Sequence, residues 1–370
     1  MKALVVAGAR PNFMKVAPIL RELGQRGESG LLLHTGQHYD FEMSASFFED
    51  LGLPPPAYYL GVGSGTHADQ TARIMQAFEP VLLETEPDWV VVVGDVNSTL
   101  ACALVAAKLQ PQLGCRVAHV EAGLRSRDWA MPEEVNRVLT DRLSDLLLTT
   151  SAEAQENLRV EGIAADRIVF AGNVMIDTLM RELPRARQSG VMARLGVEAR
   201  KYVAVTLHRP SNVDSKERLR EILRGLADLS RVVPVVLPLH PRTRERVQSF
   251  GLESLMEHLV VSEPLGYHEM LCLMDGASGV FTDSGGVQEE TTVLGVPCGT
   301  LRETTERPVT VLKGTNRMVK WPPTAEAIRI AYDEMLGRPR LKVGEAAPAG
   351  WDGRAAERIV KSLRSWSLDE

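Results

Sequence analysis

The sequence predicts two doubly wound α/β domains, each built on a parallel β-sheet with helices on both faces. Short runs rich in Val, Ile and Leu alternate along the chain with amphipathic stretches of helical period, and both halves repeat this scheme. The apolar runs lack the polar alternation of half-exposed strands, which favours strands buried on both faces. The chain also has 370 residues, more than the roughly 250–300 that a single core usually reaches.

The first domain is expected over residues 1–175. Thr150 followed by Glu153 has the spacing of a capping box, so Thr150 is predicted to begin the last helix of this domain. The predicted strands are Ala3–Ala7, Leu31–Thr35, Trp89–Val93, Val117–Val120, Leu146–Thr149 and Ile168–Ala171. The predicted helices lie near Phe13–Gly24, Gln70–Glu84, Thr99–Lys108, Glu133–Ser144 and Ala152–Glu161.

The second domain is expected over residues 176–353. The polar stretch Arg181–Lys201 is interpreted as the connection between the domains, and an amphipathic helix is expected from about Arg354 to Trp366. The predicted strands are Tyr202–Leu207, Val233–Leu237, Leu259–Val261, Gly279–Phe281 and Cys298–Leu301. The predicted helices lie near Lys216–Leu229, Arg242–Phe250, Tyr267–Met274, Val287–Gly295 and Thr324–Leu336.

Composition and charge restrict the class of protein. The formal charge of 42 − 48 = −6 argues against a nucleic-acid partner, which needs a clustered basic surface. The first apolar run is short and soon followed by Arg10, unlike a secretory signal, and no run reaches the ~18 apolar residues of a membrane span. The four cysteines are scattered, which disfavours a zinc site or a disulfide framework. We therefore expect a cytoplasmic enzyme that does not bind membranes.

Residues directly after the strands are the first candidates for function, because parallel α/β sheets bind ligands outside the carboxyl ends of their strands. After the first strand, Arg10 and Lys15 surround a helix start and are consistent with an anion site or with two solvated side chains. Asp95 and Glu121 each follow or end a buried strand, and Glu133 opens a helix. Three carboxylates around one cavity would suit proton transfer. The alternative is that they cap loops and helix starts.

In the second half, His208 and His240 each follow a strand, although a single such histidine is more often a packed residue. A strand also runs into Ser284-Gly285-Gly286 and directly into a helix. Two glycines permit close approach of a ligand, and the helix start offers free amides to a diphosphate. Glu290, about one helical turn on, is placed to bind ribose hydroxyls. Arg302 and Arg307 follow the next strand and would add positive charge.

Together these segments resemble the non-hydrolysing UDP-N-acetylglucosamine 2-epimerases. Eight motifs carry the resemblance in order along nearly the whole chain: GARPNFMK, TGQHYD (Thr35–Asp40), GDVNST, HVEAGLRS, MPEEVNR, TLHR, TDSGGVQEE and TERP. Members of this family have two Rossmann-like domains facing across a cleft, the glycosyltransferase-B fold. They are usually homodimers, and their C-terminal helix, here 354–370, typically packs back on the first domain.

The resemblance also implies an activity and its residues. The substrate would be a UDP-sugar, interconverted between UDP-N-acetylglucosamine and UDP-N-acetylmannosamine by elimination and re-addition of UDP, without metal or other cofactor. The implied catalytic residues are Lys15, Asp95, Glu121, Glu133 and His208. The implied substrate-binding residues are Arg10, His240, Ser284, Gly285, Gly286, Glu290 and Arg307.

Several positions depart from the pattern of the family. Tyr39-Asp40 replaces residues that bind an activating second substrate in regulated bacterial members, so we expect no such activation. This stretch and Pro210-Ser211-Asn212 are also similar to members acting on UDP-2,3-diacetamido-glucuronic acid. The exact sugar therefore stays open, as does the choice of C2 base. A hydrolysing epimerase and a glycosyltransferase of the same fold are further alternatives, although the clustered acids argue against a transferase.

Overall fold

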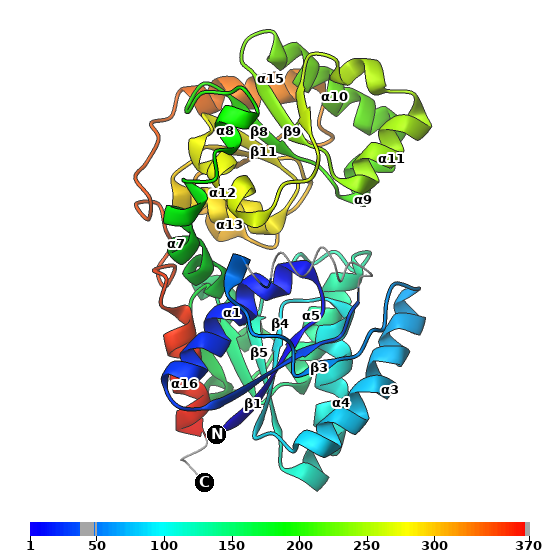
Figure 1. Ribbon diagram of the computed structural model, residues 1–370, viewed down its shortest axis with the longest axis vertical. Coiled ribbons are helices and arrows are strands. Elements are labelled where there is room, and N and C mark those ends of the chain that lie inside the picture. Colours follow the sequence, from blue (N-terminus) through cyan, green and yellow to red (C-terminus); the bar gives the residue numbers. More distant parts are fainter. Residues whose placement is uncertain (38–47, 49, 367–370) are drawn as a thin grey trace. The chain divides into compact units, whose positions relative to one another are not determined.

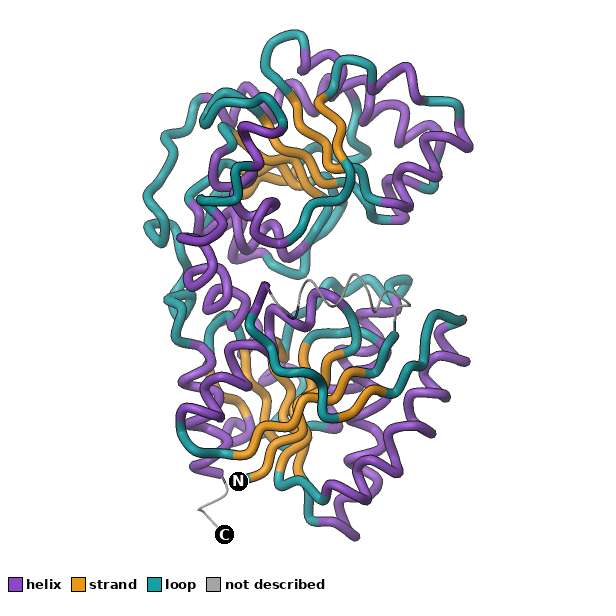
Figure 2. The backbone as a smooth tube through the Cα atoms, viewed as in Figure 1, coloured by secondary structure: helices purple, strands orange, loops and turns teal. Residues whose placement is uncertain are grey.

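The chain forms two compact α/β units in the computed structural model, which describes residues 1–37, 48 and 50–366. Unit 1 comprises Met1–Arg181 and Ala349–Glu370, and unit 2 comprises Glu182–Pro348. In each unit, helices cover both faces of one twisted parallel sheet (Figures 1 and 2). The two Rossmann-like domains predicted from the sequence are therefore confirmed.

The sheet of unit 1 has seven strands in the order β3-β2-β1-β4-β5-β6-β7. They are β1 Lys2–Ala7, β2 Ser29–His34, β3 Tyr58–Tyr59, β4 Trp89–Val93, β5 Arg116–Ala122, β6 Leu146–Thr149 and β7 Ile168–Phe170. The helices are α1 Arg10–Gln25, α3 His67–Thr85, α4 Asn97–Leu113, α5 Pro132–Leu143, α6 Ala152–Val160, the 3₁₀ turn Ala165–Arg167, α7 Val174–Ala186 and, at the end of the chain, α16 Ala355–Trp366.

The sheet of unit 2 has six strands in the order β10-β9-β8-β11-β12-β13. They are β8 Val203–Thr206, β9 Val235–Pro238, β10 Val260–Ser262, β11 Gly279–Thr282, β12 Cys298–Thr300 and β13 Asn316–Met318. The helices are α8 Val191–Arg194, α9 Pro210–Val213, α10 Lys216–Ser230, α11 Pro241–Phe250, the 3₁₀ turn Glu253–Met256, α12 Tyr267–Gly276, α13 Gly285–Leu294, α14 Pro308–Leu312 and α15 Ala325–Leu336.

Every strand predicted from the sequence overlaps an observed one, because the buried strands are continuous apolar runs. In β4, Trp89 and Val90–Val92 are fully buried and Val93 is 1% exposed, as expected for a central strand covered on both faces. The two strands that the sequence analysis missed, β3 and β13, are edge strands of two and three residues. Neither is long enough to produce a recognisable hydrophobic period.

One local prediction was wrong. The N-cap of α6 is Ser151, whose hydroxyl accepts a hydrogen bond from the amide of Ala154, so Thr150 lies one residue too early. The boundary between the units falls between Arg181 and Glu182, at the start of the stretch Arg181–Lys201. This stretch contains the end of α7 and all of α8.

Both sheets reverse their strand order at one point, where connections leave in opposite directions. This point lies between β1 and β4 in unit 1 and between β8 and β11 in unit 2. Ligands of open α/β sheets bind at such switch points, outside the carboxyl ends of the strands. The sequence-predicted site residues follow these same strands.

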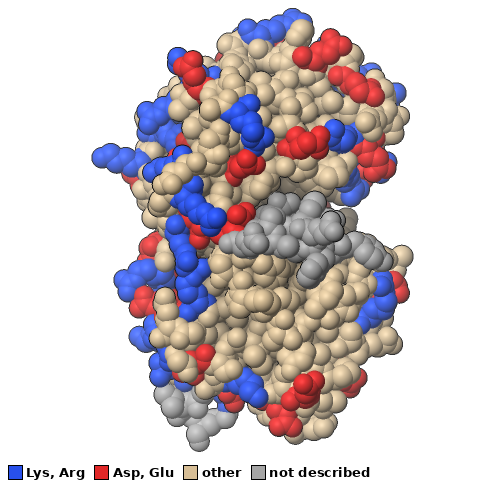
Figure 3. Space-filling model, viewed as in Figure 1, with Lys and Arg blue, Asp and Glu red and all other residues tan. Residues whose placement is uncertain are grey.

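The described part of the chain contains no helix with the length and hydropathy that a membrane crossing requires. The four cysteines are buried and free. Among the described residues, no three His, Cys, Asp or Glu side chains are grouped as metal ligands. Basic and acidic side chains are interspersed on the face drawn in Figure 3.

Candidate active site

The loop from β1 into α1 is fixed by a close approach of backbone and by one asparagine. A Cβ atom on Gly8 would lie 2.5 Å from Cβ of Ser98, so a larger residue does not fit there. The Asn12 side chain accepts hydrogen bonds from the amides of Gly8 and Ala9, both at 3.0 Å. Arg10 is the first residue of α1. The GARPNFMK motif therefore builds a rigid turn at the switch point of unit 1.

Lys15 and Glu121 form a buried ion pair at this edge of the sheet. Lys15 is 7% exposed and reaches from α1 to the end of β5, close to the backbone of Gly94. Glu121 lies at a register shift between β5 and β6 and has φ of +74°, a conformation that non-glycine residues seldom adopt. Strained backbone of this kind is concentrated at functional sites, because surrounding contacts must hold it in place.

Asp95 follows β4 after one residue, Gly94, and pairs with Arg137 of α5. The distance from Oδ2 of Asp95 to Nη2 of Arg137 is 2.5 Å, and the carboxylate remains 27% exposed. The side chain of Asn136 donates to the carbonyl oxygen of Asp95 at 2.9 Å. Helix α5 thus orients both the backbone and the side chain of Asp95, with the carboxylate still accessible to a ligand.

Two adjacent glutamates at the start of α5 have different environments. Glu134 is 2% exposed and accepts hydrogen bonds from the amides of Ser126 and Arg127 at 2.9 and 2.8 Å, and it also pairs with Arg137. Burial opposes ionisation, but these donors outweigh it and lower the pKa of Glu134. Glu133 is half-buried, and no ion pair with it is found in the described part of the chain. Glu134 is therefore structural, and Glu133 is the one accessible to a ligand.

A buried network supports the loop that carries Asp95. His119 lies between Asp141 and the carbonyl of Gly94, with 2.6 Å from Nδ1 to Oδ1 of Asp141 and 2.8 Å from Nε2 to the oxygen of Gly94. Arg125 pairs with the second carboxylate oxygen of Asp141 at 2.8 Å. Burial opposes ionisation of Asp141, but His119 and Arg125 outweigh it and lower its pKa. This network can thereby fix the position of Gly94 and of the residue after it.

In unit 2, the carboxylate of Asp283 organises the neighbourhood of His208. Asp283 is fully buried at the end of β11 and accepts the amides of His208 and Arg209 at 3.0 and 2.9 Å. The ring Nδ1 of His208 lies 3.0 Å from Oδ1 of the same carboxylate, while the ring itself is 35% exposed. Burial opposes ionisation of Asp283, but His208 outweighs it together with the other donors and lowers its pKa. The fixed carboxylate of Asp283 therefore sets the direction in which Nε2 of the His208 ring points.

His240 has a structural role that explains its position. It is the N-cap of α11, and its Nδ1 accepts a hydrogen bond from the amide of Arg242 at 3.2 Å. Its ring lies 5.4 Å from the ring of His208. The structure therefore places the two predicted histidines next to each other. His240 also caps the N-terminus of α11.

Ser284 begins helix α13, and its side chain makes no capping hydrogen bond. The first amides of α13 therefore keep their donors for another acceptor. A Cβ atom on Gly285 would lie 2.5 Å from Nη1 of Arg307 and 3.0 Å from Oε1 of Glu306. A larger residue here would have to displace the Arg307 guanidinium group, which packs against the start of the helix.

The positive charge expected from Arg302 and Arg307 is neutralised within unit 2. Arg307 pairs with Glu289 at 2.7 Å and with Glu306, and Arg302 pairs with Glu306 at 2.8 Å. Both arginines are 7% exposed. The sequence analysis did not weigh Glu289 and Glu306, the two acids that pair with these arginines.

Glu290 is buried in unit 2 beside Glu289 and Tyr267. Burial raises the pKa of Glu290 to about 8, with the negative charge of Glu289 adding to the effect and Tyr267 opposing it. Burial likewise raises the pKa of Tyr267. At pH 7 this pKa favours the protonated form of the carboxyl group.

The structure gathers Lys15, Asp95 and Glu121 at the switch point of unit 1, with Glu133 on the helix that holds Asp95. It gathers His208, His240 and the α13 start at the switch point of unit 2. Sequence reasoning missed the supporting residues Arg137, His119, Asp141 and Asp283. Asp283 stands directly before Ser284, so its place at the strand end was the available signal. The predictions on His38, Tyr39 and Asp40 lie outside the described residues.

Comparisons with known proteins agree over the full length of the chain. A protein-family profile described as UDP-N-acetylglucosamine 2-epimerase matches residues 21–364. A Methanocaldococcus jannaschii protein named UDP-N-acetylglucosamine 2-epimerase is 42% identical, over 98% of this chain and 99% of its own. A Pseudomonas aeruginosa protein named UDP-2,3-diacetamido-2,3-dideoxy-D-glucuronate 2-epimerase is 43% identical over 98% and 99% of the two chains.

Solved structures give the same relationship. The crystal structure of the Methanocaldococcus jannaschii UDP-GlcNAc 2-epimerase in complex with UDP-GlcNAc and UDP superposes with a TM-score of 0.89, covering 99% of this chain and 100% of the other at 42% identity. The Neisseria meningitidis enzyme bound to UDP-GlcNAc superposes with a TM-score of 0.87, covering 99% and 100% at 29% identity.

Proposed function

The chain belongs to the UDP-N-acetylglucosamine 2-epimerase family, and from this premise we propose that it inverts C2 of a UDP-linked 2-acetamido sugar, with UDP-N-acetylglucosamine as substrate and UDP-N-acetylmannosamine as product. The observation that carries the proposal is the group of carboxylates at the switch point of unit 1: Asp95 and Glu121, each paired with a cation, and the partly accessible Glu133 at the start of α5. Acids concentrated at one sheet edge serve proton transfer.

The chemistry explains why these groups are needed. C2 is not next to a carbonyl group, so its proton is barely acidic. In the proposed reaction, a base takes the proton from C2 while the C1–O bond breaks. The electron pair of the C1–O bond leaves with UDP, and the electron pair of the C2–H bond forms the new double bond. The remaining 2-acetamidoglucal has a C1=C2 double bond. UDP then adds back at C1, and a proton is delivered to the opposite face of C2.

In this mechanism, unit 1 supplies the acid and the base. We assign the proton exchange to Asp95 and Glu133, whose carboxylates are partly accessible, with proton transfer of this kind typically contributing about 10²–10⁴-fold to the rate. Glu121 is buried in its ion pair with Lys15 and positions the substrate. Arg137 holds the carboxylate of Asp95 in a fixed orientation for proton exchange at C2 of the sugar.

Unit 2 binds and stabilises the departing UDP. The free amides at the α13 start, with Ser284, receive the diphosphate, and preorganised donors of this type are worth several kcal/mol in the transition state. Glu290 binds the ribose hydroxyls. His208, directed by Asp283, polarises the substrate. No step requires a metal ion or a redox cofactor.

A second candidate substrate is UDP-2,3-diacetamido-glucuronic acid. The Pseudomonas aeruginosa relative that bears this name is as similar to the chain as the Methanocaldococcus jannaschii epimerase, at 43% and 42% identity. The two sugars differ at C3 and C6, whereas the proposed chemistry takes place at C1 and C2. The same site residues would therefore serve either substrate.

Proton NMR of the purified protein with UDP-N-acetylglucosamine in heavy water tests the proposal. UDP-N-acetylmannosamine with deuterium at C2 is the expected product. Free N-acetylmannosamine would instead identify a hydrolysing enzyme, and inversion without deuterium incorporation would contradict cleavage of the C2–H bond. A parallel reaction with the diacetamido-uronic substrate decides between the two sugars.

Two expectations from the sequence accompany this function. A homodimer is expected, and light scattering during size-exclusion chromatography measures its mass directly. Cytoplasmic location is the second, and fractionation of the source cells tests it.

A further inference from the structure

A separate pocket lies at the amino edge of the unit 2 sheet, opposite the carboxyl edge that carries His208 and Ser284. Asp275 and Gly276 end α12, which precedes β11, and Arg200 lies shortly before β8. Arg187 follows α7, and Arg340 follows α15. The pocket has a volume of about 290 Å³ and is lined by Arg187, Met192, Ala199, Arg200, Cys272, Asp275, Gly276 and Arg340.

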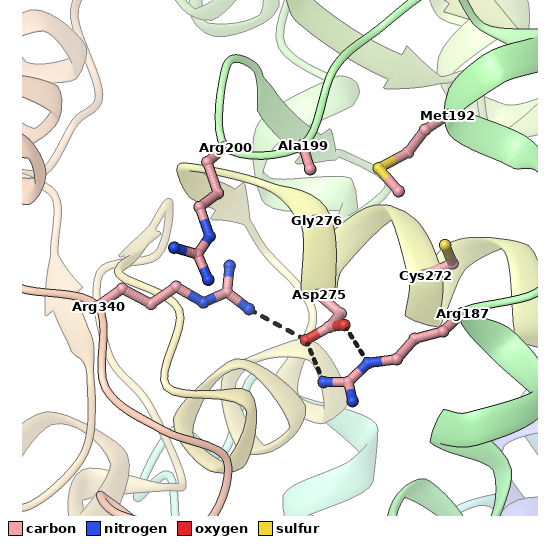
Figure 4. Close-up of a pocket in the computed structure, with 8 residues that line it drawn as sticks. All are labelled: Arg187, Met192, Ala199, Arg200, Cys272, Asp275, Gly276 and Arg340. Atoms are coloured by element: carbon pink, nitrogen blue, oxygen red, sulfur yellow. Dashed lines mark hydrogen bonds and ion pairs between the residues drawn. The ribbon is translucent and has the colours of Figure 1, made fainter.

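Both oxygens of the Asp275 carboxylate are used by two of the arginines (Figure 4). Nε and Nη2 of Arg187 lie 2.7 and 3.3 Å from its two oxygens, and Nη2 of Arg340 lies 3.0 Å from Oδ1. Nη1 of Arg340 donates to the carbonyl of Ala277 at 3.0 Å. These contacts tie α12 to its flanking segments and use two of the three arginines that line the pocket.

Arg200 is that third arginine. Its amide donates to the carbonyl of Gly276 at 2.6 Å, and its φ of +65° is unusual for a residue with a side chain. In Figure 4 its guanidinium group points toward that of Arg340, and in the described part of the chain it has no carboxylate partner. Burial lowers the pKa of Arg340. The positive charges of Arg200 and Arg187 lower it further, whereas the negative charge of Asp275 raises it. Three arginines against one aspartate leave two formal positive charges in one pocket.

We propose that this pocket binds a phosphate dianion, either free or as a small phosphomonoester, between Arg200 and Arg340. The planar guanidinium fork matches the geometry of phosphate oxygens and binds them through paired, charge-assisted hydrogen bonds. Two negative charges would cancel the excess charge. The site lies on the other edge of the sheet from the proposed diphosphate cradle, so it is separate from the epimerase site and does not rest on its assignment.

Methyl NMR of the full chain carrying [methyl-¹³C]methionine gives a local readout, because Met192 lines the pocket. Its resonance is assigned by the Met192→Leu variant. Titration with sodium phosphate at constant ionic strength is expected to shift this resonance saturably, and an equal titration with sodium chloride is not. UMP as a second titrant separates a phosphomonoester from the free ion.

Charge variants decide whether the arginine cluster is responsible. Arg200→Gln is expected to weaken the phosphate response of the Met192 resonance at least tenfold. The matched control Arg224→Gln, an exposed arginine of α10 that pairs with Glu221, is expected to leave it unchanged. Asp275→Asn is expected to lower the melting temperature, with phosphate restoring more of it than chloride does. An unshifted Met192 resonance, or equal shifts in wild type and Arg200→Gln, would overturn the proposal.

Discussion

In unit 1 the carboxylates of Asp95 and Glu121 at the sheet edge are each paired with a cation, whereas in unit 2 the edge is built from backbone amides and internally compensated charges. Asp95 pairs with Arg137 and Glu121 with Lys15. In unit 2 Arg307 and Arg302 are neutralised by Glu289 and Glu306, and the free donors belong to the α13 start. The two sheets nevertheless share the strand order around their switch points.

This difference separates two tasks that the same topology can perform. Carboxylates gathered at one sheet edge can take up and release protons, as acid–base chemistry requires. A helix N-terminus without neighbouring unpaired cations binds an anion through its backbone amides, because these N–H groups point toward a common position. We therefore expect changes in unit 1 to affect turnover first, and changes in unit 2 to affect nucleotide binding or the orientation of His208.

The largest effect is expected from Asp95→Asn. The amide keeps the shape of the side chain but removes the base, so turnover should fall by about 10³-fold while UDP affinity stays within about threefold. Turnover is measured by NMR and affinity by calorimetry. Asp69→Asn is the matched control, because Asp69 forms a similar pair with Arg73 at 2.6 Å on the surface of the same unit. Near-normal turnover in Asp95→Asn would remove this residue from the mechanism.

Asp283→Asn tests the orientation of His208. Loss of a buried hydrogen bond to a charged group costs about 1.5–3 kcal/mol, so kcat should fall by about 10–100-fold with KM changed less than threefold. Asp214→Asn, in the exposed pairs with Arg242 and Arg246, serves as the control. If Asp283 were only structural, the melting temperature would fall but the folded fraction would keep its kcat.

Gly285→Ala tests the close packing at the α13 start. The added methyl group would displace Arg307, so UDP affinity is expected to fall about tenfold and stability by about 1–3 kcal/mol. The control is Gly24→Ala in α1, where an added Cβ would meet no atom within 4 Å. Unchanged UDP affinity in Gly285→Ala would argue against the helix start as the diphosphate site.

The smallest effect is expected from Glu290→Gln. Because the folded pKa of Glu290 is about 8 and the unfolded pKa about 4.5, the folded protein binds an additional proton between these values. The stabilising contribution of this proton is complete below about pH 4.5 and is lost as pH rises to 8, by about 1.4 kcal/mol per pH unit. Urea unfolding at pH 6 and pH 7 should show this slope in wild type relative to the variant. Parallel curves for the two proteins would contradict protonation of Glu290.

The fold was predictable because most strands of both sheets are continuous apolar runs followed by amphipathic helices. The family was predictable because motifs such as TDSGGVQEE combine residues with separate physical roles at a strand–helix junction. Family membership and the two Rossmann-like domains are confirmed. The short edge strands β3 and β13 were missed, since two or three residues cannot show a period.

The supporting residues of the site were harder to predict from the sequence. Asp141 pairs with His119 across 22 positions, and Glu306 compensates Arg302 and Arg307 within one loop. Which charges meet depends on side-chain direction and burial, and neither follows from spacing along the chain. The sequence also could not separate Glu133 from its neighbour Glu134, because their difference arises from the loop amides that Glu134 binds.

Helix α16 has a consequence for the order in which the protein assembles. It belongs to unit 1, where it packs on α1 and its first amides bind Asp177 at 3.0 and 2.7 Å (red beside blue in Figure 1). A ribosome makes all of unit 2 before it makes this helix. During synthesis, the apolar surface of unit 1 that will receive Ile359, Val360 and Leu363 therefore stays uncovered until α16 emerges, after all of unit 2. Although the synthesis of unit 1 begins first, its native structure can be completed only after unit 2 has been made.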